Sequence, residues 1–161
     1  MNIDFFINYL EHLSYAGIFI TLVLVGYLIP VPEEIVLLIV GYISALGFND
    51  VYIALIVSII ALQVGDNFLF LLSKGGGKYI IKIMQKYKQE TIQKYDRSLK
   101  NHSGKTIFSL RFIIGVRMFG PLLAGSLNIR WATFLLYDTL ALISYASLYI
   151  FLGYHFHNQT L

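Results

Sequence analysis

The sequence contains no cysteine, and this absence restricts the chemistry it can support. Without cysteine the chain forms no disulfide, no thiolate metal site and no cysteine nucleophile. His155 and His157 have no further metal ligands near them in the sequence, so we expect no metal site. No serine or threonine stands in a G-x-S-x-G context, which leaves nucleophilic hydrolysis without support. The sequence therefore predicts neither an enzyme nor a protein with a cofactor.

Charged residues are also scarce. Only 13% of the 161 residues are charged, whereas 57% are hydrophobic. Soluble domains average about 25% charged residues, and a domain of this size in water would still expose roughly a third of its unfolded surface. We therefore expect an all-α integral membrane protein. The N-terminal residues carry acids where a signal peptide carries bases, so we expect that no signal peptide is cleaved.

Most of the basic residues lie in one segment. Nine of the twelve lysines and arginines fall between Lys74 and Lys105. Beside apolar spans, this distribution predicts a cytoplasmic segment that faces anionic lipid head groups. It lacks the base-reading context of a nucleic-acid module, so we expect no nucleic-acid partner. Apolar residues at helical spacing from Gly77 to Leu99 favour a helix in the interface plane, with a solvated helical hairpin as the alternative.

Two apolar stretches reach the roughly 20 residues that a helical bilayer crossing needs. They are Val51 to Ser73 and Trp131 to Tyr154. Each follows an apolar stretch that is interrupted by residues unsuited to a straight helix. Broken backbone at membrane depth is tolerated only where protein buries it or where it lines a wet cavity. We therefore predict two re-entrant or broken helical segments, with breaks at Pro30, Pro32, Gly115, Gly120 and Pro121.

This layout predicts a single membrane domain over residues 1–161. Residues 13–73 form a first re-entrant segment plus span, residues 74–105 the basic amphipathic segment, and residues 106–157 a second re-entrant segment plus span. Many transporters place repeats of opposite topology around a site near the bilayer midplane. The repeated order of elements therefore suggests an inverted repeat.

Several ionisable residues interrupt the apolar stretches, although each costs roughly 2.5 to 3.5 kcal/mol at the centre of a membrane span. Arginine binds phosphate through two parallel hydrogen bonds and stays charged, and carboxylates in a low dielectric can exchange protons near neutral pH. The alternative is that these residues snorkel or form ion pairs that only hold the bundle together. We expect Glu33 at a hairpin tip in water. The ionisable residues are Glu33, Glu34, Asp66, Arg111, Arg117 and Asp138.

The motifs around these residues resemble those of the DedA family, the bacterial branch of the SNARE-associated Golgi or VTT-domain proteins. Pro30-Val31-Pro32-Glu33-Glu34 is similar to the P-x-P-x-E motif of the family, which favours Glu34 over Glu33 as the matching acid. Ile114 stands where the family usually has proline, and relatives commonly add a further hydrophobic helix after Gly153. The remaining matches are Gly65-Asp66 with Phe70, Lys74 and Gly77, then Phe108 to Arg111, Gly115 to Arg117, and Ala124-Gly125.

The resemblance implies dependence on proton-motive force and movement of undecaprenyl phosphate or phosphatidylethanolamine across the cytoplasmic membrane. We therefore expect a lipid flippase in which Arg111 and Arg117 bind the phosphate of the substrate, while Glu34 and Asp66 exchange protons. Glu33 and Asp138 are secondary candidates. The expected partners are membrane lipids, the phosphate-bearing lipid and protons, with a homo-oligomer left open. The alternatives are a proton-coupled ion antiporter for pH or envelope homeostasis, and a non-transporting scaffold.

Overall fold

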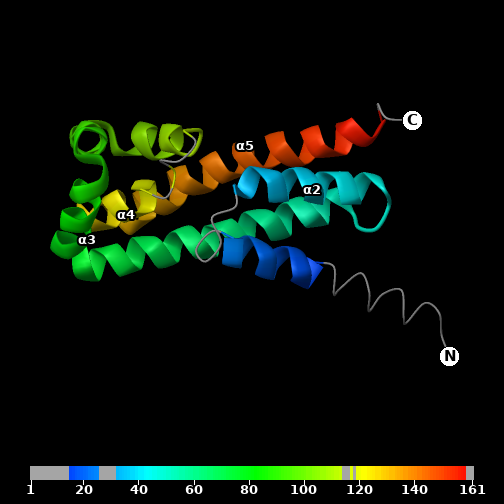
Figure 1. Ribbon diagram of the computed structural model, residues 1–161, viewed down its shortest axis with the longest axis horizontal. Helices are drawn as coiled ribbons and strands as arrows, with labels where there is room; N and C mark the ends of the chain where they lie inside the picture. Colours follow the sequence, from blue (N-terminus) through cyan, green and yellow to red (C-terminus); the bar gives the residue numbers. More distant parts are fainter. Residues whose placement is uncertain (1–14, 26–31, 114–116, 118, 159–161) are drawn as a thin grey trace. The chain divides into compact units, whose positions relative to one another are not determined.

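The computed structural model describes residues 15–25, 32–113, 117 and 119–158. Every secondary-structure element in these ranges is a helix, which confirms the predicted all-α class (Figure 1). The apolar helix Tyr15–Val25 comes first. The labelled helices are α2 (Glu33–Ala45), α3 (Val51–Leu110), α4 (Phe119–Ser126) and α5 (Trp131–Asn158).

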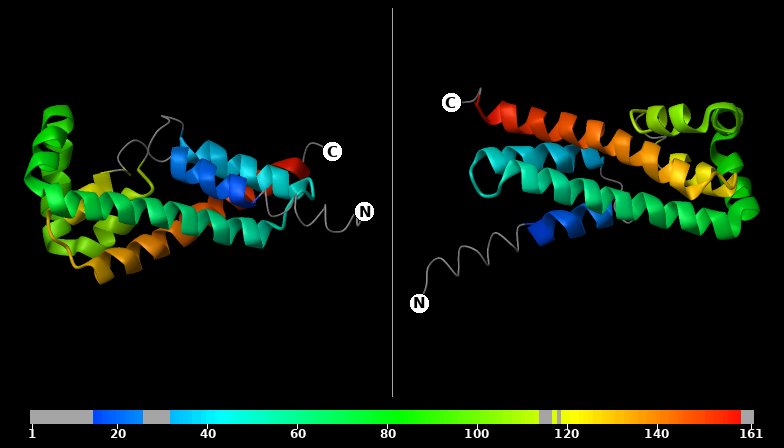
Figure 2. Two further views of the ribbon diagram at one scale, coloured as in Figure 1. Left: turned by 90° about the horizontal axis from the view of Figure 1, so that it is seen from below. Right: turned by 180° about the vertical axis from the view of Figure 1, so that it is seen from behind.

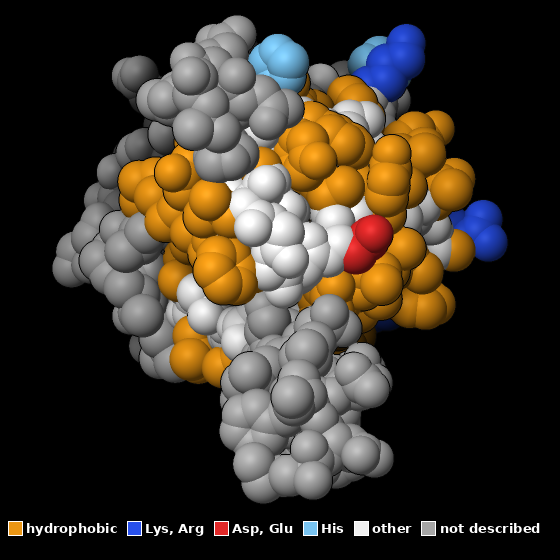
Figure 3. Space-filling view, turned by 90° about the vertical axis from the view of Figure 1, so that its right-hand side faces the viewer, with side chains coloured by type: hydrophobic (Ala, Val, Ile, Leu, Met, Phe, Trp, Pro, Cys, Tyr) orange, Lys and Arg blue, Asp and Glu red, His pale blue; other side chains and the backbone are white. Residues whose placement is uncertain are grey.

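Within the described residues, two helical segments are long and apolar enough to cross a membrane. They are Val51–Gly76 in α3 and Trp131–Phe156 in α5, each of 26 residues, and they confirm the two spans predicted from the sequence. Large hydrophobic side chains are exposed along α3 at Ile53, Ile56, Ile60 and Val64. Such surfaces suit lipid rather than water, and hydrophobic side chains also dominate the face drawn in Figure 3.

The chain divides into two compact units, which are described separately. One comprises Met1–Gly65 with Ser144–Leu161, and the other comprises Asp66–Ile143. We call them the terminal unit and the central unit. Helices α3 and α5 contribute residues to both units.

In the terminal unit, α2 and α5 pack through glycines. A Cβ on Gly41 would lie 2.0 Å from the carbonyl oxygen of Ile150, and a Cβ on Gly153 would lie 2.1 Å from that of Leu38. Each helix therefore brings its backbone directly against the other at a position where only glycine fits. Small residues give this close approach in many membrane helix pairs.

In the central unit, α3 folds back on itself. Asp66 and Arg111 are hydrogen bonded although 45 residues separate them, whereas a straight helix would place them roughly 68 Å apart. The further views of the ribbon show α3 bending back (Figure 2). The predicted helix from Gly77 to Leu99 lies within this bent stretch; its position at a membrane surface stays a prediction.

The fold-back encloses an apolar core. The rings of Phe70 and Phe134 are stacked with centroids 4.6 Å apart, which joins α3 to α5. Removing large side chains from such a core typically costs about 3 to 5 kcal/mol. The core consists of Phe70, Leu99, Ile107, Leu123, Ala124 and Phe134.

Helices α2 and α4 end in the same way. After each helix one residue has a positive φ, 83° at Gly47 and 54° at Asn128. In both turns the amide of this residue bonds back three residues and the next amide bonds back five, which defines a Schellman motif. The amide-to-carbonyl pairs are Gly47 to Ser44 and Phe48 to Ile43 after α2, and Asn128 to Gly125 and Ile129 to Ala124 after α4. A candidate span follows each motif within a few residues.

Helix α4 is held against α3 by a further glycine contact. A Cβ on Gly125 would lie 2.0 Å from Ser73 Oγ and 2.2 Å from the carbonyl oxygen of Phe70. The backbone carbonyl cannot swing away as a side chain could. Gly120 differs, because a Cβ there would meet only Leu110 side-chain atoms at 3.7 Å.

We predict that Gly125→Ala lowers the stability of the protein by about 1 to 3 kcal/mol, because overpacking forces α4 away from α3. Gly120→Ala in the same helix is the matched control and should leave stability nearly unchanged. Thermal unfolding in detergent, followed by the far-ultraviolet signal of the helices, measures both. Equal melting temperatures for the two variants would contradict the close packing.

Candidate site around the Asp66–Arg111 ion pair

A buried ion pair lies in the central unit. Nη1 of Arg111 donates a hydrogen bond to Oδ2 of Asp66. Arg111 is 5% exposed and Asp66 8% exposed. Asp66 belongs to the candidate span Val51–Gly76, and Arg111 directly follows the end of α3. The structure thus brings together two of the four residues that the sequence singled out.

The register of the fold-back explains why these two residues meet. Phe70 lies four residues after Asp66, and Ile107 lies four residues before Arg111, and both belong to the apolar core. Residues four apart share one face of a helix. The two arms of α3 are therefore paired antiparallel, with the apolar contact one turn away from the ion pair. Core packing holds the carboxylate and the guanidinium opposite each other.

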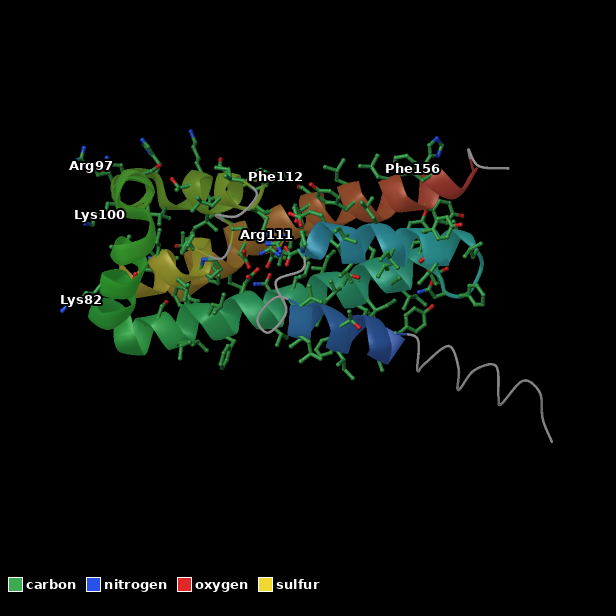
Figure 4. All side chains as sticks on the ribbon, viewed as in Figure 1. Lys82, Arg97, Lys100, Arg111, Phe112 and Phe156 are labelled. Carbon is green, nitrogen blue, oxygen red and sulfur yellow. The ribbon has the colours of Figure 1, made fainter. Side chains whose placement is uncertain are left out.

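Other basic side chains of the central unit behave differently. Lys82, Arg97 and Lys100 are exposed, and Figure 4 shows them on the outside while Arg111 points into the interior. Arg111 is therefore buried, unlike the exposed basic residues that are expected to face lipid head groups. Its charge is neutralised inside the protein by Asp66.

A tryptophan hydrogen bond lies next to the ion pair in sequence, and we did not anticipate it. Trp131 Nε1 donates to Asn67 Oδ1 at 2.8 Å, which joins the first residue of α5 to the residue after Asp66. Trp131 is the only tryptophan of the chain. Its position at the start of a span was a usable signal, because tryptophan favours the ends of membrane spans. The bond thus adds a second link between α3 and α5 in the central unit.

Glu33 and Glu34 occupy the first turn of α2 in the terminal unit, after Pro32 as N-cap. Glu33 is 4% exposed and Glu34 9% exposed. The expectation that Glu33 lies in water at a hairpin tip is therefore wrong. Helix α2 begins directly after the proline, whose missing N–H costs little at a helix start, and the helix dipole favours carboxylates in the first turn. A proton-exchange role for Glu34 stays a prediction.

The remaining candidates occupy different settings. Asp138 is 3% exposed within α5, in the span Trp131–Phe156. Arg117 is partly buried in the turn between α3 and α4. Gly120 and Pro121 lie in the first turn of α4, where proline is tolerated because the first amides have no helical partner. Pro30 and Gly115 lie outside the described residues. No cluster of three or more His, Asp or Glu able to hold a metal occurs in the part of the chain that the structure describes.

A helical chain whose described residues include two candidate spans, one of which contributes the carboxylate of a buried ion pair, has the organisation of a membrane protein. Residues 29–155 match the VTT domain. The chain belongs to the DedA family of VTT-domain proteins, as the sequence motifs predicted.

Individual relatives agree with this assignment. The chain is 28% identical over 146 residues to the uncharacterized membrane protein YkoX of Bacillus subtilis, covering 89% of this chain and 64% of the relative. It is 29% identical to protein DedA of Escherichia coli K12, covering 78% and 59%. It is 27% identical to undecaprenyl phosphate transporter A of Bacillus subtilis, covering 95% and 77%. The chain thus spans less than two thirds of the length of YkoX and of DedA. No solved structure matches it significantly.

We predict that Arg111→Gln destabilises the protein by about 3 to 5 kcal/mol, because it leaves the Asp66 carboxylate buried without its counter-charge. Adding Asp66→Asn should recover much of this loss, since two neutral amides can hydrogen bond in the same place. Unfolding in mixed detergent micelles gives the free energy for the wild type, both single variants and the double variant. Strictly additive effects of the two substitutions would contradict the pairing.

Proposed function

We propose that this protein is a proton-motive-force-dependent flippase for a phosphate-bearing lipid in the bacterial cytoplasmic membrane. The observation that carries the proposal is the buried Asp66–Arg111 ion pair, whose carboxylate belongs to a candidate membrane span. An intramembrane ionisable pair is costly and is commonly part of a substrate or proton pathway. The name of the Bacillus subtilis relative, undecaprenyl phosphate transporter A, supports a polyprenyl phosphate as substrate. A phospholipid such as phosphatidylethanolamine is the other substrate of the same chemistry.

The arginines are the proposed phosphate ligands. Arg111 and Arg117 both lie between the end of α3 and the start of α4, in the same unit. A guanidinium presents a planar fork of donors that matches the oxygens of a phosphate and does not lose its proton. Two such groups on non-helical backbone can converge on one head group, which two arginines six residues apart on a straight helix cannot easily do.

Proton coupling follows from the pairing of Arg111 with Asp66. Without substrate, the carboxylate of Asp66 neutralises Arg111. When the phosphate binds Arg111, the ion pair with Asp66 weakens and the carboxylate of Asp66 takes up a proton, because a buried carboxylate with a weakened ion pair is costly away from water. In both states the buried arginine faces one anion. Proton and phosphate thus bind together, and Glu34 is the proposed second proton acceptor.

We further propose that the halves of the chain form an inverted repeat with two re-entrant segments. The order of short helix, Schellman motif and candidate span occurs twice, through α2 and α3 and through α4 and α5. The packing is reciprocal as well: α2 contacts the C-terminal part of α5, and α4 contacts α3 near Phe70. Repeats of opposite topology give transporters two similar states that open to opposite sides. The exposed bases Lys82, Arg97 and Lys100 support a cytoplasmic position for residues 74–105.

We predict that Arg117→Ala abolishes movement of fluorescent undecaprenyl phosphate across proteoliposomes that carry a pH gradient, because one of two phosphate ligands is lost. Arg97→Ala, which removes an exposed arginine of the same unit, is the matched control and should transport normally. Asp66→Asn should uncouple transport from the gradient. Recovery of folded protein in the liposomes is checked for every variant.

Each alternative function predicts a different experimental result. Normal lipid movement by Arg117→Ala would exclude the phosphate-binding role. Proton-coupled uptake of labelled cations without lipid movement would replace the flippase by an antiporter. Rescue of a deletion strain by the Glu34→Gln, Asp66→Asn double variant would favour a scaffold. Running undecaprenyl phosphate and phosphatidylethanolamine in parallel identifies which lipid is moved.

A further inference from the structure

A groove in the terminal unit lies apart from the charged residues discussed above. It runs between the helix Tyr15–Val25 and α2, and its volume is about 250 Å³. This volume is just below the range of small-molecule pockets, roughly 300 to 1,000 Å³. Among the residues that the structure describes, no charged side chain lines it. The lining residues are Gly17, Ile18, Thr21, Val36, Ile39, Val40, Ile43 and Asn49.

The α2 wall of the groove is a continuous apolar stripe. Val36, Ile39, Val40 and Ile43 follow the spacing of one helix face. From Val36 to Ile43 the stripe extends roughly 10 Å along the helix axis. The opposite wall is partly open at Gly17, where an added Cβ would meet no described atom within 4 Å. The groove therefore offers an extended apolar chain an apolar wall of that length.

One end of the groove carries a polar side chain with unmet hydrogen bonds. Asn49 is 8% exposed, and neither its amide nitrogen nor its amide oxygen bonds to any residue that the structure describes. Buried side-chain amides almost always have partners, and leaving one without a partner costs about 1 to 3 kcal/mol per group. Because Asn49 lines the groove, a molecule bound there can supply both bonds.

The backbone around Asn49 is fixed in place. The Schellman motif after α2 sets the turn that precedes it. The next residue, Asp50, caps α3 by accepting from the amides of Tyr52 at 2.8 Å and Ile53 at 3.0 Å. The amide of Asp50 donates to the hydroxyl of Tyr15 at 2.8 Å, which ties the first helix to this turn. The amide of Asn49 is thus preorganised at the end of the groove.

We propose that this groove holds a resident membrane glycerophospholipid, with one acyl chain along α2 and the glycerol ester region at Asn49. The ester carbonyl accepts from Asn49 Nδ2, and a hydroxyl or ammonium of the lipid donates to Oδ1. Asn49 lies two residues before the candidate span Val51–Gly76, so the polar end of the groove is near the end of that span. Ester groups lie at this depth, at the border of the hydrocarbon core.

The residues that line the groove favour a glycerophospholipid over other ligands. An ion or free phosphate would find no opposite charge on the described lining residues of the groove. A single water molecule would satisfy Asn49 but leave the apolar wall unfilled. The uncharged polar ester region of a lipid matches Asn49 at one end of the groove. Its apolar acyl chain matches the apolar stripe of α2. The lipid stays bound and is distinct from the transported substrate, so the inference does not depend on the proposed transport activity.

Native mass spectrometry of the full chain in mild detergent, titrated with phosphatidylethanolamine, tests the proposal. The wild type should retain a single tightly bound lipid. Asn49→Leu should weaken retention by roughly fivefold to a hundredfold, the contribution of its two hydrogen bonds. Gly17→Leu should fill the groove and abolish retention. Gly75→Leu is the matched control, because a Cβ at Gly75 also meets no described atom within 4 Å, and it should bind normally.

Melting temperatures measured without added lipid establish that the variants fold. Retention of the lipid by folded Gly17→Leu, or equal loss in Gly75→Leu, would overturn the proposal. A photoreactive diazirine side chain at Val36 identifies the occupant in proteoliposomes. A phospholipid adduct that disappears in Gly17→Leu supports the lipid. An adduct with a second copy of the chain, or with residues 1–14 of the same chain, would overturn it in favour of a protein occupant.

Discussion

The need to neutralise a charge buried within a membrane span governs the central unit. Asp66 is placed in a candidate span, and a carboxylate there requires a partner. The chain supplies Arg111 by bending α3 back through the basic segment until two arms of one helix lie antiparallel. The Phe70–Phe134 stack and the glycine contact at Gly125 stabilise that return. The fold of the unit and the ion pair therefore depend on each other.

The same ion pair lowers the energetic cost of the proposed mechanism. An arginine that always faces one anion avoids the penalty of an unpaired buried charge, whether the anion is the carboxylate or a lipid phosphate. In the proposed mechanism Arg111 moves from Asp66 to the lipid phosphate, and Asp66 takes up a proton at the same time. The net charge inside the protein therefore changes little. Transport also requires helices to move. The close backbone contacts between α2 and α5 would let these two helices move together as one rigid body.

Much of the fold could be predicted from the sequence, because apolar length and the cost of buried charge are local properties. The two candidate spans followed from them, while the re-entrant breaks and a role for Asp66 stay predictions. The Asp66–Arg111 pairing could not be predicted, since it requires the fold-back of α3, which no local pattern encodes. Glu33 was misplaced because Pro32 indicated a turn in water, whereas it serves as the N-cap of a helix whose first turn is buried. Asn49 was overlooked because an asparagine after Gly-Phe is typical of an exposed turn.

The most direct test of the account measures protons taken up when undecaprenyl phosphate binds the purified protein in weakly buffered detergent solution. Exchange of Arg111 from Asp66 to phosphate predicts net proton uptake by the wild type, and predicts that this uptake is lost in Asp66→Asn while the lipid still binds. Subtracting the variant removes any proton taken up by the lipid itself. Equal proton uptake by the two proteins would contradict the exchange and leave the pair as a purely structural bond.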